Sequence, residues 1–402
     1  MALIVQKFGG SSVADAQRIF HVAEIITKTY QQGNSVCVVL SAQGDTTDDL
    51  IEKAREINPD ASRREMDMLL SCGEQMSIAL MAMAIEKLGF PVVSLCAWQI
   101  GMATDSNHSA AHITKVDCER VKEELDRKRI VLAAGFQGVD RTGDITTLGR
   151  GGSDTTAVAL AVELQADLCQ IYTDVDGVYT SDPRIVPEAR KLSEITYDEM
   201  LELASMGAQV LHNRSVELAK SYGVQLEVLS SFTGNPGTIV KEVVKKVEKT
   251  YITGVAQDKK IARFALVGLE DVPGVAYKLF NLLAKGKINV DMIIQSLGHD
   301  ERKDIIFTVA DKDSMVCARL LDENKDVLKY DHMDINTGVS KVSIVGAGML
   351  ENAGVAAKMF EALYQAHINI HMISTSEIKV SVLIDKEDSD RAVRVIHNIF
   401  FQ

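Results

Sequence analysis

Apolar residues in the first 240 positions alternate between the spacing of buried strands and the spacing of amphipathic helices. Short apolar runs predict strands at 3–8, 35–40, 92–95, 130–134, 168–172 and 226–229. Apolar positions three and four apart predict helices over 14–29, 65–88, 157–164, 200–204 and 215–222. Strands that alternate with helices predict an α/β fold, with a mostly parallel sheet and helices on both of its faces.

The rest of the chain carries an internal repeat. The pattern at 267–293 returns about 80 residues later at 345–373. Each copy reads strand, glycine turn, helix and strand, followed by a further strand and helix, which predicts two ferredoxin-like βαββαβ units. The expected domains are therefore 1–240, a lysine- and valine-rich connector at 241–262, and two small units at 263–334 and 335–402.

Composition narrows the functional class. The 402 residues are 46% hydrophobic and 25% charged, which is typical of a globular protein of two or three domains. The net charge of −13 argues against a nucleic-acid partner. Six cysteines without a C-x-x-C pair favour reduced thiols. No apolar run approaches the ~20 residues of a membrane span, and the N-terminus lacks a basic leader, so we expect a cytoplasmic protein.

Two glycine-rich turns, at 7–12 and 149–154, run directly into predicted helices. Glycine lets the backbone approach an anion, and a helix start offers free N–H groups. Lys7 closes a strand, where parallel sheets bind ligands, although a solvated lysine is the simpler alternative. Arg150 offers a planar fork that matches a carboxylate, although Ser153 and Asp154 could also serve only as helix caps. Two such turns suggest a protein that holds two anionic substrates together.

Two further segments carry weaker signals. Acidic residues follow the strand at 168–172 and could hold Mg²⁺ or ribose, but Asp-Gly is also ordinary turn chemistry. Glu74 precedes an apolar helical stretch and could bind an ammonium group, or could serve only the helix dipole. We expect Met76, Met81 and Met83 in the core, and His108 and His112 in a loop. There is no P-loop, protein-kinase motif or dinucleotide spacing, so nucleotide chemistry would need another fold.

Together these motifs resemble the aspartokinases of the amino-acid kinase superfamily. The resemblance spans nearly the whole chain and rests on the ordered segments 7–13, 41–47, 73–74, 136–138, 147–156 and 173–184. The repeat is similar to the paired ACT domains that sense amino acids in this family. The layout is similar to the short monofunctional type, because no dehydrogenase pattern follows the repeat.

The resemblance implies transfer of the γ-phosphoryl group of ATP, with Mg²⁺, to the β-carboxylate of L-aspartate. The products would be 4-phospho-L-aspartate and ADP, in the first step towards lysine, threonine and methionine. An aspartate carboxylate has a pKa near ~4 and is already ionised, so no general base is needed. Catalysis would consist of alignment and of cations and N–H donors directed at the transferred group.

The resemblance also assigns residues. Lys7, Glu74 and Arg150 would be catalytic. Aspartate would be bound by Ser41, Thr47, Glu74, Arg150, Gly151, Gly152, Ser153 and Asp154. The nucleotide would be bound by Lys7, Phe8, Gly9, Gly10, Thr173, Asp174, Tyr179, Asp182, Arg184 and Gln209. Gln209 is a departure, because many members carry a lysine there in Gly-Ala-Lys-Val-Leu-His. Which carboxylates would ligate the metal is left open.

In the repeat, the positions that match the effector site are Asp271, Gly274, Asn289, Gln295, Asn369 and Ile370. The resemblance suggests lysine and/or threonine as feedback inhibitors and a homo-oligomer formed through the ACT domains. Three alternatives stay open: a related kinase for glutamate or acetylglutamate, a catalytically inactive amino-acid sensor, and a repeat that only dimerises.

Overall fold

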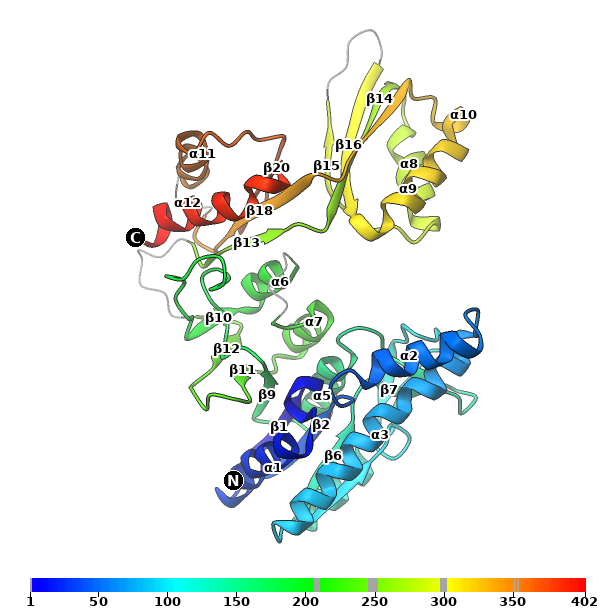
Figure 1. Cartoon of the computed structure of the whole chain (residues 1–402), viewed down its shortest axis with the longest axis vertical. Helices are drawn as coiled ribbons and strands as arrows, with labels where there is room; N and C mark the ends of the chain where they lie inside the picture. Colours follow the sequence, from blue (N-terminus) through cyan, green and yellow to red (C-terminus); the bar gives the residue numbers. More distant parts are fainter. Residues whose placement is uncertain (1, 206–209, 245–251, 297–301, 350–351, 353) are drawn as a thin grey trace. The chain divides into compact units, whose positions relative to one another are not determined.

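The computed structural model describes residues 2–205, 210–244, 252–296, 302–349, 352 and 354–402. The chain divides into two compact units, which are coloured along the sequence in Figure 1. The first unit consists of Met1–Tyr179 and Arg190–Lys246, and the second consists of Thr180–Ala189 and Val247–Gln402. The short segment Thr180–Ala189 thus belongs with the C-terminal residues.

The first unit is built on an eight-stranded sheet of order β10-β12-β11-β9-β1-β2-β6-β3. Its strands are β1 (Leu3–Phe8), β2 (Ser35–Leu40), β3 (Val92–Leu95), β6 (Ile130–Ala134), β9 (Leu168–Thr173), β10 (Glu194–Thr196), β11 (Leu226–Ser230) and β12 (Thr238–Lys241). All neighbouring strands are parallel except β11 and β12. This confirms the predicted, mostly parallel sheet.

Helices cover both faces of this sheet. On one face, α1 (Ala16–Gln31) and α3 (Arg63–Lys87) lie side by side, and their apolar residues pack on alternate residues of β1, β2 and β6 (Figure 1). On the other face, α4 (Glu119–Asp126) and α5 (Gly152–Glu163) pack against the intervening residues, such as Val5 and Cys37. Strands buried on both faces explain the continuous apolar runs in the sequence.

Smaller elements complete the first unit. They are the 3₁₀ turn η1 (Gly10–Val13), the helices α2 (Thr46–Ile57), α6 (Tyr197–Ser205) and α7 (Asn213–Tyr222), and a second sheet of β4 (Met102–Thr104), β5 (Ile113–Val116), β7 (Gln137–Val139) and β8 (Ile145–Thr147). Sequence analysis did not predict α2, whose residues are all at least partly exposed. It also missed the second sheet, whose strands are only three or four residues long.

Helix α3 corrects two expectations. By length and mean hydropathy it could cross a membrane, so the statement that no segment approaches a span was wrong. However, 44% of its most apolar stretch is buried inside the protein, and α3 packs on α1 and on the strands β2, β3, β6 and β8, as a core helix does. Met81 is fully buried as predicted, but Met76 and Met83 are 52% and 61% exposed, because they lie on the outer side of the helix.

The second unit contains two four-stranded sheets, of orders β15-β16-β14-β17 and β13-β18-β20-β19. The first comprises β14 (Ile261–Glu270), β15 (Val290–Gln295), β16 (Arg302–Ala310) and β17 (His332–Asn336), with helices α8 (Val275–Lys285), α9 (Ser314–Glu323) and α10 (Lys325–Leu328) and the 3₁₀ turn η2 (Asp311–Asp313). The second comprises β13 (Gly254–Asp258), β18 (Val339–Val345), β19 (Met372–Thr375) and β20 (Lys379–Asp385), with helices α11 (Val355–Gln365) and α12 (Ser389–Phe401) and the 3₁₀ turn η3 (Lys386–Asp388). The ferredoxin-like plan is therefore confirmed for the repeat.

The edge strand β13 lies within the range 241–262 that was expected to be a connector. It pairs antiparallel with β18, although the whole of β14–β17 intervenes in the sequence. Strand β13 is therefore the fourth strand of the sheet of the second repeat.

Segment 180–189 is anchored in the core of the second repeat. Val186 is 1% exposed and belongs to the same apolar cluster as Val255 and Ile396. The carbonyl of Thr180 accepts a hydrogen bond from the backbone of Val255 (2.8 Å), and the carbonyl of Ile185 accepts one from the Arg394 guanidinium (2.9 Å). A segment that follows β9 in the first unit is thus a structural part of the second.

Candidate active site

The loops that follow β1 and β2 lie against each other at the carboxyl ends of these neighbouring strands. The backbone N–H of Gly44 donates to the carbonyl of Gly10 (3.0 Å). A Cβ on Gly10 would be 2.6 Å from the Ala42 carbonyl oxygen, so only glycine fits there. This edge of a parallel sheet is where such folds bind ligands.

Lys7 and the start of α5 meet at this edge. The ammonium of Lys7, on the penultimate residue of β1, lies 2.7 Å from a carboxylate oxygen of Asp154, and both side chains are only 12–13% exposed. Asp154 lies in the first turn of α5, directly after the second glycine-rich turn. The two turns that the sequence singled out are therefore brought together by β1 and α5.

The turn before α5 depends on its glycines. Gly149 and Gly151 have φ angles of 77° and 72°, in the left-handed region. A Cβ on Gly151 would be 2.2 Å from the imidazole of His212, which lies at the start of α7. Arg150, between these glycines, is exposed and makes no ion pair with the described part of the chain. Its guanidinium is therefore available to a ligand.

Ser153 and Gly152 lie in the first turn of α5, and Ser153 also contacts the end of β6. A Cβ on Gly135 would be 2.5 Å from the hydroxyl oxygen of Ser153. Ser41 directly follows β2, and Thr47 is the second residue of α2. All four positions border the same edge of the sheet.

Glu74 lies in the middle of α3, so its interpretation as a first-turn dipole residue was wrong. Its side chain is buried, with 3% of the residue exposed. One carboxylate oxygen accepts a hydrogen bond from the backbone of Ala42 (3.1 Å), and the other is buried without a partner in the described residues. Burial raises the pKa of Glu74 to about 7. A buried carboxylate oxygen without a donor fits a ligand that brings one, such as an ammonium group.

Phe8 is a core residue as far as its side chain is concerned. The ring is fully buried and stacks on Tyr172, with 4.4 Å between ring centroids. The neighbouring Gly9 borders the Lys7 ammonium, because a Cβ there would be 3.6 Å from the ammonium nitrogen.

The third glycine turn, after β9, is organised by Asp176. Its carboxylate accepts hydrogen bonds from the hydroxyl of Tyr179 (2.6 Å) and the amide of Asn235 (3.2 Å), and Lys191 lies 3.5 Å away. The bond to Asp176 raises the pKa of Tyr179 to about 12 and lowers that of Asp176. Sequence analysis missed Lys191 and Asn235, which reach this turn from distant segments.

The other carboxylates of this turn differ in the hydrogen bonds and ion pairs that they make. Asp174 is exposed and accepts a hydrogen bond from the hydroxyl of Thr173 (2.9 Å), which leaves room for a cation. Asp182 and Arg184 form an ion pair (2.7 Å) in the second unit, whereas Asp174 and Tyr179 belong to the first. Gln209 lies outside the described residues.

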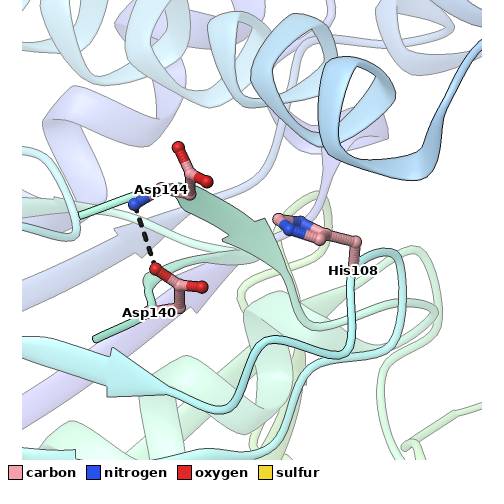
Figure 2. A group of neighbouring side chains, drawn as sticks. All are labelled: His108, Asp140 and Asp144. Carbon is pink, nitrogen blue, oxygen red and sulfur yellow. Dashed lines mark hydrogen bonds between the residues drawn. The ribbon is translucent and has the colours of Figure 1, made fainter. Parts of the chain in front are cut away.

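A further group of possible ligands, His108, Asp140 and Asp144, is drawn in Figure 2. Asp140 accepts hydrogen bonds from the hydroxyls of Thr142 and Ser106 and from two backbone N–H groups, including that of Asp144. Asp144 is paired with Arg64 (2.6 Å), and His108 bonds Asp67 (3.0 Å). These side chains brace the loop at 105–112, as expected for His108, and no further ligand is needed to explain them.

In the second unit, the predicted effector positions border the glycine turns and edge strands of the two sheets. Asp271 pairs with the nearly buried Lys303 (2.9 Å). Gly274 and Gly354 start the equivalent helices α8 and α11, with φ angles of 95° and 98°. The remaining positions adjoin or end the outer strands, namely Asn289 and Gln295 at β15 and Asn369 and Ile370 before β19.

Comparison with known proteins defines the class first. The sequence model of the Amino acid kinase family matches residues 2–230 of this chain. The sequence model of the ACT domain matches residues 264–324 and 342–400. The chain is thus an amino acid kinase domain joined to two ACT domains.

Individual relatives narrow the class. The aspartokinase of Bacillus sp. (strain MGA3) is 48% identical over 400 residues, covering 100% of this chain and 97% of the relative. The aspartokinase of Mycolicibacterium smegmatis is 49% identical over 405 residues, covering 100% and 96%. The structure of E. coli aspartokinase III in complex with aspartate and ADP has a TM-score of 0.84 at 25% identity, over the full length of both chains. The same enzyme in complex with lysine and aspartate has a TM-score of 0.77 at 26% identity, over the full length of both chains. The chain therefore belongs to the aspartokinase family of ATP-dependent phosphotransferases, which join an amino acid kinase domain to regulatory ACT domains.

Proposed function

We propose that this chain transfers the γ-phosphoryl group of ATP to the β-carboxylate of L-aspartate. The observation that carries the proposal is Glu74, whose buried oxygen has no donor although it lies beside the loop after β2. The α-ammonium of an amino-acid substrate would supply that donor. E. coli aspartokinase III, whose structure holds aspartate and ADP, has the same fold over its whole length.

The α-carboxylate of aspartate and the phosphates of ATP would also be matched by residues of the protein. Arg150 would bind the α-carboxylate of aspartate, with Ser41, Thr47 and Ser153 bordering the site. Lys7 and the backbone of Gly9 and Gly10 would face the phosphates. The β-carboxylate is already ionised, so the protein's task is to offset repulsion between two anions, which cations and fixed N–H groups do.

Asp154 would hold Lys7 in place. The ion pair of 2.7 Å fixes the ammonium between β1 and the start of α5. Because the two side chains are only about one-eighth exposed, a charge without a partner would be costly there, and each supplies the other's partner when no phosphate is bound.

Asp174 is a better candidate ligand for Mg²⁺ than Asp176. Asp176 already accepts bonds from Tyr179 and Asn235 and faces Lys191, whereas Asp174 is exposed and accepts a bond from the hydroxyl of Thr173. Asp174 would therefore help to hold the metal that offsets phosphate charge. Asp182 and Arg184 would assist with the nucleotide.

The ACT pair would bind lysine and/or threonine and inhibit the kinase. The support is the paired glycine turns at Gly274 and Gly354, together with the lysine complex of E. coli aspartokinase III. We also propose a homo-oligomer formed through the ACT domains and a cytoplasmic location.

The test is ATP-dependent ADP release with aspartate, glutamate or acetylglutamate as acceptor, with Arg150→Ala as a control. We expect turnover with aspartate that Arg150→Ala reduces mainly through a higher KM for aspartate. Turnover only with another acceptor would identify a different kinase of this fold. Effector binding without turnover on any acceptor would identify an amino-acid sensor.

A further inference from the structure

Asp67 is a buried carboxylate with no established part in the reaction. It lies on α3 with 0% of its surface exposed. Its two oxygens accept bonds from the backbone of Ser109 (2.9 and 3.1 Å), from the backbone (3.1 Å) and hydroxyl (2.6 Å) of Thr147, and from His108 (3.0 Å). Burying a carboxylate is costly unless its oxygens are hydrogen-bonded, and here both are fully used.

These bonds hold strand β8, which leads into the glycine-rich turn at 149–154. This turn carries Arg150 and is called the arginine turn below. Thr147 is the last residue of β8, and Arg150 follows three residues later. Ser109 has a φ of 70°, which is unusual for a residue other than glycine, and its N–H points at the carboxylate. The carbonyl of Ser109 then meets Gly149, where a Cβ would be only 3.0 Å away. Asp67 therefore contacts Thr147 directly, and it holds Ser109, whose carbonyl lies against Gly149, the residue before Arg150.

Arg214, on α7, holds the same turn through other atoms. Its guanidinium donates to the carbonyls of Leu148 (3.0 Å) and Ala111 (2.9 Å). The backbone of Ala111 in turn donates to the carbonyl of Thr147 (2.9 Å). The two segments that Asp67 joins are thus also joined to each other, and the arginine turn has little freedom to shift.

Asp67 and Glu74 lie on the same helix, seven residues apart. Seven residues are about two helical turns, or ~10 Å, so both side chains extend from the same side of α3. Asp67 holds the segment before Arg150, and Glu74 has the buried oxygen without a hydrogen-bond donor. We propose that Asp67 is a positioning residue that fixes Arg150 at a set separation from Glu74, and so determines affinity for aspartate and discrimination against the longer glutamate. This inference rests on the proposed function.

The test compares steady-state kinetics of wild-type protein with those of Asp67→Asn, Thr147→Val and Thr147→Ser. An amide at 67 cannot accept all the bonds made by the carboxylate, so Ser109 or Thr147 loses its acceptor. For Asp67→Asn we expect the KM for aspartate to rise about 10- to 100-fold, while the KM for ATP changes less than about twofold. Thr147→Val, which deletes one hydroxyl, should show a smaller rise of the same kind, and Thr147→Ser should restore it. The ratio of kcat/KM for aspartate over glutamate should fall in both impaired variants.

Equal changes in both KM values, or an unchanged KM for aspartate in a folded Asp67→Asn variant, would overturn the inference. If Asp67→Asn does not fold, the Thr147 pair decides: no difference between valine and serine would overturn it. Failure of the proposed function is distinguishable, because the wild-type protein would then show no aspartate-dependent turnover at all.

Discussion

The buried carboxylate of Glu74 should make aspartate use depend on pH in a way that one substitution abolishes. Burial raises its pKa to about 7, whereas the ammonium of aspartate stays charged and its carboxylates stay ionised between pH 6 and 8. With that pKa, about nine-tenths of the free enzyme carries a charged Glu74 at pH 8 and about one-tenth at pH 6. We therefore expect kcat/KM for aspartate to fall about tenfold from pH 8 to pH 6.

Glu74→Gln is the matched variant, because it keeps the shape and removes the charge. Its kcat/KM for aspartate should be low at every pH and should lose the tenfold dependence, while the KM for ATP stays close to wild type. Because only the wild-type protein carries the carboxyl group at position 74, the comparison of the two pH profiles assigns the effect to Glu74. A Glu74→Gln profile with the wild-type slope would refute the reasoning.

The same shift makes a prediction about stability. A carboxyl whose pKa is higher in the folded than in the unfolded state makes folding less favourable as pH rises from about 4.5 to about 7. A rise of the pKa from 4.5 to about 7 on folding lowers the free energy of unfolding by about 3 kcal/mol above pH 7. Glu74→Gln should therefore raise Tm at pH 8 and change it little at pH 5, measured by thermal unfolding. A lower Tm for the variant at pH 8 would contradict this account.

Three further outcomes test other parts of the molecule. Lys7→Ala should lower kcat by at least about 100-fold, and because Asp154 loses its partner it should also lower Tm; unchanged turnover would remove Lys7 from the mechanism. Gly151→Ala should reduce both stability and aspartate affinity, because a methyl group there collides with His212 at a positive φ; wild-type behaviour of this variant would contradict the described turn. Lysine or threonine should shift the aspartate saturation curve, and titration calorimetry with no heat from either amino acid, alone or together, would oppose the proposed regulation.

The sequence predicted those parts of the fold and site whose signals are local. The strands that end at Phe8 and Leu40 were found with their observed bounds, because short, mainly apolar segments stop there at glycine or polar turns. The turn with Arg150 was recognisable because adjacent glycines precede a helical pattern.

Residues that act over long separations were not predictable in this way. Asp67 and Arg214 contact segments about 40 to 100 positions away, and neither has a local motif. The helix-dipole interpretation of Glu74 was wrong, because the residue lies in the middle of α3. In fact Gly73 is inside the helix, where any Cβ would lie 2.7 Å from the side chain of Ala42. Close packing of α3 against the loop after β2 explains that glycine.

The position of residues 180–189 affects how this protein can be divided. The polypeptide crosses between the two units at 179/180, at 189/190 and again at 246/247. A gene fragment starting at Val247 would encode ACT domains without Val186, leaving part of their apolar interior uncovered. In the intact chain, a single peptide bond separates Tyr179, in the turn after β9, from Thr180, whose carbonyl accepts a hydrogen bond from Val255 of β13. The turn after β9 is therefore joined to the edge strand of the second repeat by one residue.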